Sequence, residues 1–298
     1  MASKLFIFIF FSSLPFVVLS PFSSFSKIQL PPNVTAPVAV AFDFLGRGPY
    51  VAASNDRILR WLGPLFDFTD FAYTTPNKTK QLCDGTTNPN LGPVCGKPYA
   101  LSFSFSGNLY IADAYLGLLA VGLNGGRATQ LVTSAEDVPF RFLTAVDVDI
   151  LTEIVYFTDF SATLELRQIH CLSFPFQTTP LHRRLIENTA KRILKYWLRG
   201  PKANTAGILT SLPAEPNEIR RNLVGDFWMP IRTVANQKPA SVIVPRGLKI
   251  NQFGAVLANI SLSAQYYNVS VSVMLEQNLA LYTSSSFNAV NFVGVYRI

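Results

Sequence analysis

The sequence predicts an all-β fold of the β-propeller type, and the first observation behind this is a recurring pattern. An apolar strand with an aromatic or aliphatic residue near its middle is followed by a polar break and, in most cases, by a second strand. One such unit per about 45 residues is typical of propeller blades of four strands. The pattern occurs six times, at 47–61, 107–121, 153–168, 184–197, 225–233 and 279–298.

Composition is the second observation. The chain has 298 residues, of which 49% are hydrophobic and 14% charged, so a single large domain can bury a sizeable core. Aromatic residues at 13% and 20 prolines favour strands and turns over long helices. Two stretches resemble helices most, "GPVCGKPYALSFS" (92–104) and "RILKYWLRGPK" (192–202), but the repeat register predicts strands for both.

The second unit, 107–121, shows the order of elements within a repeat. "GNLYIADAYLGLLAV" opens at a turn glycine, Gly107, and its apolar strand ends at Asp113 before "GLLAV" restarts. Asp159 in "YFTDF" and Glu187 in "LIEN" take the matching places. Either these side chains cap turns, as Asp commonly does, or they face the central channel as weak candidates for a cation site. Ser54 interrupts this acidic series in another unit.

The N-terminus has the features of a secretory signal peptide. Lys4 precedes the apolar run 5–19, and small residues follow at 20–24. We therefore expect a signal over 1–24 and one propeller domain over 25–298; the alternative, a membrane anchor, requires a longer run without Pro15. No later segment is apolar enough to cross a bilayer.

Sequons and cysteines agree with an oxidising lumen. Two cysteines, Cys83 and Cys95, flank a turn-rich loop, and we expect them to form a disulfide. Zinc binding is the weaker alternative, because two thiolates supply only half of the ligands of a structural zinc site. Cys171 is left over. Four sequons predict glycosylation, at Asn33, Asn77, Asn259 and Asn268.

Charge does not indicate nucleic acid. Most of the net +7 falls in residues 183–202, which hold seven basic residues and one acidic residue. We expect these basic residues to form a solvated or disturbed surface of the protein. The alternative is that they bind an acidic partner. The sequence contains no Ser-His-Asp arrangement and no phosphate-binding glycine loop, because "GLNGG" is an ordinary turn.

Longer stretches resemble a known family. "CGKPYALSF", "VYFTDFS", "RILKYWLRGPKA", "EIRRNLVGDFW" and above all the run 109–149 resemble the plant strictosidine synthase family and its strictosidine synthase-like relatives. The resemblance implies a six-bladed propeller, a monomer, that enters the secretory pathway and reaches the vacuole or apoplast. It implies a pocket for a small molecule, no cofactor, and a loop disulfide matching Cys83 and Cys95.

The resemblance also implies a reaction, the condensation of tryptamine with secologanin assisted by a buried glutamate. Aligned on Tyr282, that glutamate falls at Ser272 and the family's neighbouring histidine at Ser270. Glu276 is a weak substitute, because it lies about 13 Å further along the strand. We therefore expect no authentic strictosidine synthase activity. The family's pocket positions match Tyr99, Phe142, Phe160 and Asn188.

One region departs from the family. Between Gln168 and Arg192 the chain is several tens of residues shorter than the family pattern, which predicts a blade truncated around 168–192. Such a blade exposes strand edges. A mis-assembled gene model or splice variant is the interpretation we favour, and Cys171, His170 and His182 all fall there.

Two other functions stay open. The first is a calcium-dependent esterase or lactonase of the paraoxonase and gluconolactonase type, with Asp113, Asp159, Glu187 and Asn188 as candidate ligands. The second is a non-catalytic glycoprotein that binds a small molecule or another protein. The missing glutamate favours the second.

Overall fold

The computed structural model describes residues 22–297 apart from 33, 54–56, 76–79, 84–85, 87, 136, 150, 160–175, 180–181, 188–189, 198–200, 203–204, 237–239 and 287–288. The predicted leader, Asn33, Asn77, Phe160, His170, Cys171 and Asn188 therefore lie outside the described residues, as do the side chains of His182 and Glu187.

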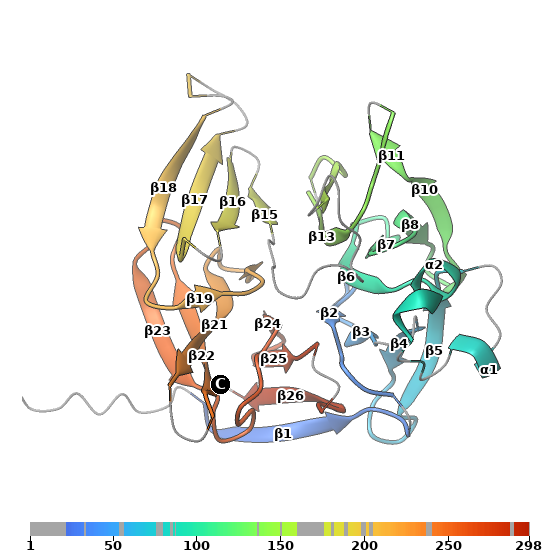
Figure 1. Cartoon of the computed structure of the whole chain (residues 1–298), viewed down its shortest axis with the longest axis horizontal. Helices are drawn as coiled ribbons and strands as arrows, with labels where there is room; N and C mark the ends of the chain where they lie inside the picture. The colour runs from blue at the N-terminus through green and yellow to red at the C-terminus, as the bar shows by residue number, and fades with distance from the viewer. Residues whose placement is uncertain are drawn as a thin grey trace, which may run out of the picture.

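Sheets that are antiparallel, except where Gly126–Arg127 pairs with Phe68–Tyr73, surround a common centre, which confirms the all-β expectation (Figure 1). A propeller arrangement with four blades is recognised, and the count of six stays a prediction. The sheet nearest the chain start has the order β2 (Ala39–Ala41), β3 (Tyr50–Ala52), β4 (Arg57–Trp61), β5 (Phe68–Tyr73) and β9 (Gly126–Arg127). The next has β6 (Pro98–Phe103), β7 (Leu109–Asp113), β8 (Gly117–Val121) and β10 (Thr129–Val132).

Two further large sheets lie in the second half of the chain. One has β15 (Phe176–Thr179), β16 (His182–Glu187), β17 (Arg192–Trp197) and β18 (Ala206–Ser211). The other has β19 (Glu215–Pro216) and β20 (Arg220–Arg221) beside β21 (Phe227–Ala235), followed by β22 (Val242–Ile250) and β23 (Val256–Ser261). In the first, consecutive strands pair as neighbours, as in the repeating unit that the sequence predicts; in the second, β19 and β20 both pair with β21, and β21, β22 and β23 follow in order.

The two ends of the chain meet in one sheet. There β1 (Ser24–Gln29) pairs in register with β26 (Phe292–Arg297), which continues to β25 (Ala280–Ser284) and β24 (Val273–Gln277). Phe25 packs on Tyr296 at 4.8 Å between ring centroids. The N-terminal strand thus completes a sheet made by the C-terminus, which ties the ring of sheets together (Figure 1).

Apolar side chains on strand faces fill the space between the sheets. Leu101, Ile111 and Leu119 come from three neighbouring strands of one sheet and are essentially inaccessible to solvent. Phe227, Met229 and Ile250 take the same part in the sheet of β19–β23. This burial explains the apolar runs in the repeats, since both faces of a blade pack against neighbouring blades.

The shortest sheets mark the region that departs from the repeat. Within the described residues, β13 (Leu143–Val148) and β14 (Val155–Asp159) pair only with each other, and a separate hairpin joins β11 (Ser134–Ala135) to β12 (Val138–Pro139). Residues 176–187, inside the predicted truncation, form two strands of a four-stranded sheet. Among the described residues, the sheet with fewer strands is thus the one just upstream of 168–192, and 160–175 lie outside them.

One local expectation is wrong. Gly92–Cys95 forms the short helix α2, and only Pro98–Phe103 continues as a strand. Pro93 in the first turn favours helix there, and Gly96, with φ of 76°, ends it. Lys80–Cys83 is a second short helix, α1, and Pro89–Leu91 a 3₁₀ turn, η1. Among the described residues, no helix has the length and hydropathy needed to cross a membrane.

Candidate functional site at the start of the inner strands

Two of the predicted pocket residues contact each other. Tyr99 and Phe142 meet edge to face at 5.1 Å between ring centroids. Tyr99 is the extra residue of a β-bulge where β6 pairs with β7, between Pro98 and Ala100. Phe142 comes directly before β13 and is 1% exposed, so it is a packed aromatic that supports Tyr99, which is half-buried.

Asp113 and Asp159 both accept hydrogen bonds from the backbone, and for Asp113 this confirms the turn-capping interpretation. Asp113 is completely buried and accepts hydrogen bonds from the backbone N–H of Lys97 at 2.8 Å, Tyr115 at 2.9 Å and Leu116 at 3.0 Å. Asp159 accepts from the N–H of Arg141 and Phe142 at 3.1 and 2.8 Å. Each carboxylate therefore fastens the residue before an inner strand to the end of the next strand.

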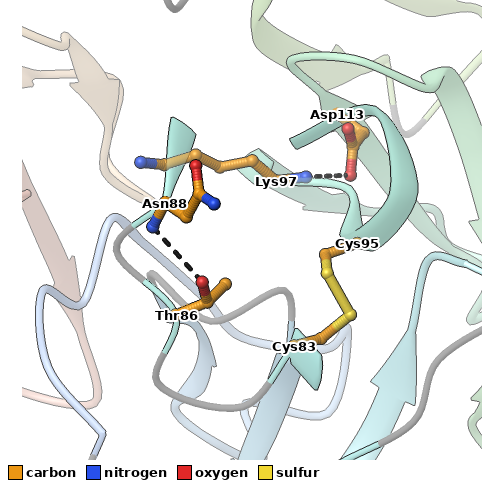
Figure 2. The surroundings of a disulfide bond; sticks show 6 residues. All are labelled: Cys83, Thr86, Asn88, Cys95, Lys97 and Asp113. Carbon is orange, nitrogen blue, oxygen red and sulfur yellow. Dashed lines mark hydrogen bonds between the residues drawn. A yellow bond between two sulfur atoms is a disulfide. The ribbon is translucent and has the colours of Figure 1, made fainter. Parts of the chain in front are cut away.

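The Asp113 contact lies close to the disulfide. Figure 2 shows the Lys97 N–H pointing at Asp113, with the Lys97 side chain running the other way. The predicted Cys83–Cys95 bond is present, with a Cα–Cα distance of 5.6 Å, and both cysteines are buried. Burial lowers the pKa of Lys97, and the charge of Asp113 opposes this shift. The disulfide thus anchors the connection that leads into β6.

Asp113 does not suit the calcium site of the hydrolase alternative. It is completely buried and accepts three backbone amides, so a cation would have to enter a closed site. Among the described residues no three His, Cys, Asp or Glu side chains gather as metal ligands. Glu187 pairs with Arg192 across β16 and β17, but its side chain is outside the described part of the chain.

Ser272, at the place of the family glutamate, is nearly buried in a serine cluster. Its hydroxyl donates to Ser286 Oγ at 3.0 Å and accepts the Ser286 N–H at 2.9 Å. Its own N–H donates to the carbonyl of Ser284 at 2.8 Å. Ser270 is buried nearby, and its carbonyl accepts the hydroxyl of Ser285 at 2.7 Å. The site is polar but has no ionisable group of its own.

A buried glutamate adjoins this cluster, and the sequence reasoning missed it. The backbone N–H of Glu218 donates to the carbonyl of Ser272 at 3.3 Å. The Glu218 carboxylate forms an ion pair with Arg220, and their side chains are only 12% and 8% exposed. Burial raises the pKa of Glu218; Arg220 opposes the shift and Asp147 adds to it. The signal was "PNEIRR", where one acidic residue lies two positions before two basic residues that form β20.

Two side chains near these residues carry buried polar atoms without a hydrogen-bond partner within the described residues. They are Arg220, at Nε and Nη2, and Ser284, at its hydroxyl. A buried donor without a partner is unfavourable by about 1–3 kcal/mol. A bound polar molecule would satisfy such a donor, which makes this end of the inner strands the candidate site.

Glu276 belongs to a different cluster, as the strand spacing predicts. Its Oε2 accepts from Trp228 Nε1 at 2.5 Å, Asn222 Nδ2 at 3.1 Å and Lys249 Nζ at 3.0 Å. Burial alone would raise the pKa of Glu276, but these three donors outweigh it and lower the pKa. A carboxylate held ionised in this way is suited to joining β24 to β21 and β22.

The described sequons differ in exposure. Asn268 is exposed, and its amide oxygen accepts the N–H of Ile243 at 2.9 Å, which leaves the nitrogen directed elsewhere. Asn259 lies within β23 with a buried amide oxygen that has no partner among the described residues. Asn268 is therefore the more accessible of the two acceptor positions.

A cavity of about 670 Å³ lies away from these residues. It is lined by residues of β1, such as Lys27 and Gln29, by Trp61 at the end of β4, and by Asp67 of the β4–β5 turn. None of the predicted site residues lines it.

Comparisons with known proteins agree on one family. No family model matches the chain. The chain is 33% identical to strictosidine synthase of Catharanthus roseus over 91% of its own length and 86% of that protein. It is 31% identical to strictosidine synthase-like 11 of Arabidopsis thaliana, over 93% of this chain and 92% of that protein. Strictosidine synthase-like 10 of the same plant is 38% identical over 67% of this chain and 62% of that protein.

Solved structures support the fold alone. A luciferin-regenerating enzyme superposes with a TM-score of 0.57 at 10% identity, covering 92% of this chain and 96% of that one. Virginiamycin B lyase from Staphylococcus aureus gives 0.55 at 9% identity, over 92% and 99%. A putative gluconolactonase gives 0.52 at 13% identity, over 90% and 94%. With its sheets arranged as propeller blades and its relatives covered nearly end to end, the chain belongs to the strictosidine synthase and strictosidine synthase-like family.

Proposed function

We propose that this chain binds a small organic molecule where its inner strands begin, and that Glu218 is the proton-handling group there. The observation that carries the proposal is the hydrogen bond from the Glu218 backbone to Ser272, the position of the family glutamate. It puts a buried carboxyl residue next to the place where the family has one. The unpartnered Arg220 Nε and Ser284 hydroxyl beside it support a polar ligand.

The chemistry of Glu218 follows from its surroundings. A carboxyl group whose pKa is raised by burial can take up and return a proton closer to neutral pH than an exposed one. Ser272 cannot do this, because a hydroxyl does not ionise in that range. The Tyr99–Phe142 pair offers an aromatic wall two sheets away in the ring. A small amine with an apolar ring is the substrate class that fits such a combination.

The family's own condensation is expected to be absent or very slow. The test uses tryptamine as the probe for binding and tryptamine with secologanin for product, detected by mass spectrometry. We expect saturable tryptamine binding and no condensed glucoside from the unmodified chain. Ser272→Glu, which restores the family carboxylate, should give product. Efficient condensation by the unmodified chain would overturn the assignment of residue 272.

The role of Glu218 needs a matched control, and Glu276 provides it. Glu218→Gln should flatten the pH dependence of tryptamine binding, whereas Glu276→Gln should leave it unchanged because that carboxylate lies in another cluster. Equal pH profiles for Glu218→Gln and the unmodified chain would remove Glu218 from the proposal while leaving the binding site in place.

A non-catalytic ligand-binding glycoprotein is the second candidate, and the Glu218–Arg220 ion pair favours it. The pair keeps the carboxylate occupied, and Arg220 could then bind an acceptor oxygen of the ligand through its Nε–H. Binding of tryptamine without turnover of any offered aldehyde partner would support this candidate. The calcium-dependent hydrolase is less favoured, because Asp113 and Asp159 are engaged by backbone amides.

The complete ring would have six blades, with β13–β14 as the remnant of the shortened one. In support, β13 packs against β6 on one side and β15 on the other, as an inner strand between two blades does. The chain would be a monomer of the secretory pathway, in the vacuole or apoplast. The buried Cys83–Cys95 bond fits an oxidising compartment.

A further inference from the structure

The turns that close the hairpins share one chemistry. The first residue of each turn is Asp, Ser or Asn, and its carbonyl accepts the N–H of a glycine three positions later. The side chain of the first residue accepts a second N–H, as Asp43 does from Leu45 and Asn251 from Phe253. The glycines have positive φ. These turns are 43–46, 104–107, 222–225 and 251–254.

Large apolar side chains occupy the positions between these polar and glycine residues. Neither the turn hydrogen bonds nor the core needs them there, and solvent-facing turn positions are usually polar. The most exposed large hydrophobic residues of the described chain are concentrated in these and equivalent turns. They are Leu65 at 89%, Leu223 at 87%, Leu279 at 83%, Val224 at 80%, and Leu151 and Phe253 at 77%.

These turns lie at one end of the ring of sheets, as contacts between neighbouring turns show. Asn278 donates to the carbonyl of Gly46 at 2.9 Å, and Phe44 meets Phe105 at 5.5 Å between ring centroids. Ser106 donates to Glu153 through both its N–H and its hydroxyl, each at 2.9 Å. Asn222 reaches Glu276, next to the β24–β25 turn. Turn follows turn, so the apolar tips share one face.

We call this surface the apolar turn face, and it is opposite the start of the inner strands. Its members are Phe44, Leu45, Leu65, Phe66, Phe105, Leu123, Leu151, Leu223, Val224, Phe253 and Leu279. They come from eight hairpin turns: three turns carry two of them each, and Phe44 and Phe105 meet across two neighbouring turns. Apolar exposure on this scale marks an interaction site. Tips that protrude from turns around a ring suit a soft layer better than the continuous packed patch of a protein interface.

The charges of this face are also compatible with a low-polarity neighbour. Arg47 neutralises Asp43 at 2.7 Å, Lys249 lies 3.6 Å from Asp226, and Glu153 is held by Ser106. Burying the face would therefore leave few carboxylates without a partner. The 670 Å³ cavity opens beside the β4–β5 turn, and its lining includes Lys27 and Asp67, one charge of each sign, and Trp61. That combination complements a zwitterionic headgroup.

We propose that the apolar turn face docks on a lipid bilayer, with the tips inserted at the interface and a phosphatidylcholine-type headgroup in the Lys27–Asp67 cavity. The binding is peripheral and is independent of the proposed function, since it uses the other end of the ring. It would hold the site at the inner-strand start facing away from the membrane, toward the lumen. Leucine and phenylalanine are the side chains that interfacial anchors use.

The experiment is vesicle flotation of the mature glycosylated protein with phosphatidylcholine liposomes. The test variant carries Leu223→Ser, Val224→Ser, Phe253→Ser and Leu279→Ser. The matched control carries Ile208→Ser and Tyr267→Ser. Ile208 and Tyr267 are 60% and 71% exposed, but Ile208 lies on β18 and Tyr267 follows the C-terminal end of β23, away from the apolar turn face. Near-UV circular dichroism establishes that both variants are folded.

We expect the unmodified protein to float, the test variant to lose at least about tenfold in partitioning, and the control to stay within about twofold. Failure of the unmodified protein to float overturns the proposal. So does an equal loss in the control, which would mean general surface stickiness. A concentration-dependent dimer in light scattering that the test variant abolishes, without flotation, would assign the face to a second copy of the chain instead.

Discussion

The sheet of β6, β7, β8 and β10 and the sheet of β13 and β14 begin with the same hairpin, but within the described residues the first has four strands and the second has two. In each, the inner strand carries one extra residue at the same place, Tyr99 in β6 and Thr144 in β13. In each, an aspartate at the end of the next strand accepts the backbone N–H before the inner strand. The local sequence therefore builds the same hairpin in both sheets.

The difference between the two sheets is burial. Asp113 is 0% exposed and binds three backbone amides, two of them from the turn that leads into β8. Asp159 is exposed and accepts the two N–H groups before β13. The contact is thus a buried junction in the sheet whose third strand is described, and a surface contact in the other sheet. The repeated sequence determines that the aspartate contact forms, and the surrounding strands determine how much it contributes to the free energy of unfolding.

The largest predicted effect comes from removing each of the two aspartates, which tests this comparison directly. Asp113→Ala removes the acceptor for three buried N–H groups, and we expect a loss of about 4 kcal/mol in the free energy of unfolding. Asp159→Ala leaves its amides accessible to water, and we expect about 1 kcal/mol. Urea unfolding of both variants measures the difference. Equal losses would mean that the outer strands add nothing to the Asp113 contact.

The second prediction concerns the sheet in which the two ends of the chain pair, and it changes Glu276 in β24. It links β24 to the neighbouring sheet through Trp228, Asn222 and Lys249, and its side chain is 20% exposed. Glu276→Gln should lower the free energy of unfolding by about 1.5 kcal/mol at pH 7, a value reduced by solvent screening.

The pH dependence of that loss has a definite sign. The pKa of Glu276 is lowered in the folded chain from its ordinary value of 4.5. Its ionised form therefore stabilises the fold fully above pH 4.5, and this stabilisation disappears as the pH falls through the lower folded pKa. The gap between the unmodified chain and Glu276→Gln should close in urea titrations below pH 4.5. A gap that stays constant down to that range would show that charge is not what Glu276 contributes.

The sequence was sufficient for the strand order of the repeats because alternation and turn chemistry are local. The strands β3, β4, β7, β8 and β17 stand where the pattern predicts them. The bulges at Tyr99 and Thr144 were not predictable, since an extra residue in a strand leaves no mark in composition. The helix at Gly92–Cys95 was missed because a loop disulfide and Pro93 decide its conformation, and no repeat governs it.

The candidate site was predictable in part for the same reason. The capping role of Asp113 follows from the residues around it, and the unsuitability of Glu276 follows from strand spacing. Glu218 was missed because its neighbour Ser272 comes from another sheet, and only the ring brings the two together. Phe160 and Asn188 lie outside the described residues, so their pocket roles stay predictions.

The smallest predicted effect sharpens the comparison inside the short sheet. Thr144 and Thr158 face each other there, with their hydroxyls 3.0 Å apart and both residues buried; the corresponding residues of the complete sheet are Tyr99 and Ala112. Thr158→Val should lower the free energy of unfolding by about 1 kcal/mol, because it takes a partner from a buried hydroxyl. Thr144→Val with Thr158→Val should lower it less than the sum of the single changes, since two apolar groups of the same shape then pack together. Additive losses in thermal unfolding would show that the two hydroxyls are independent, and that the two-stranded sheet holds without this pair.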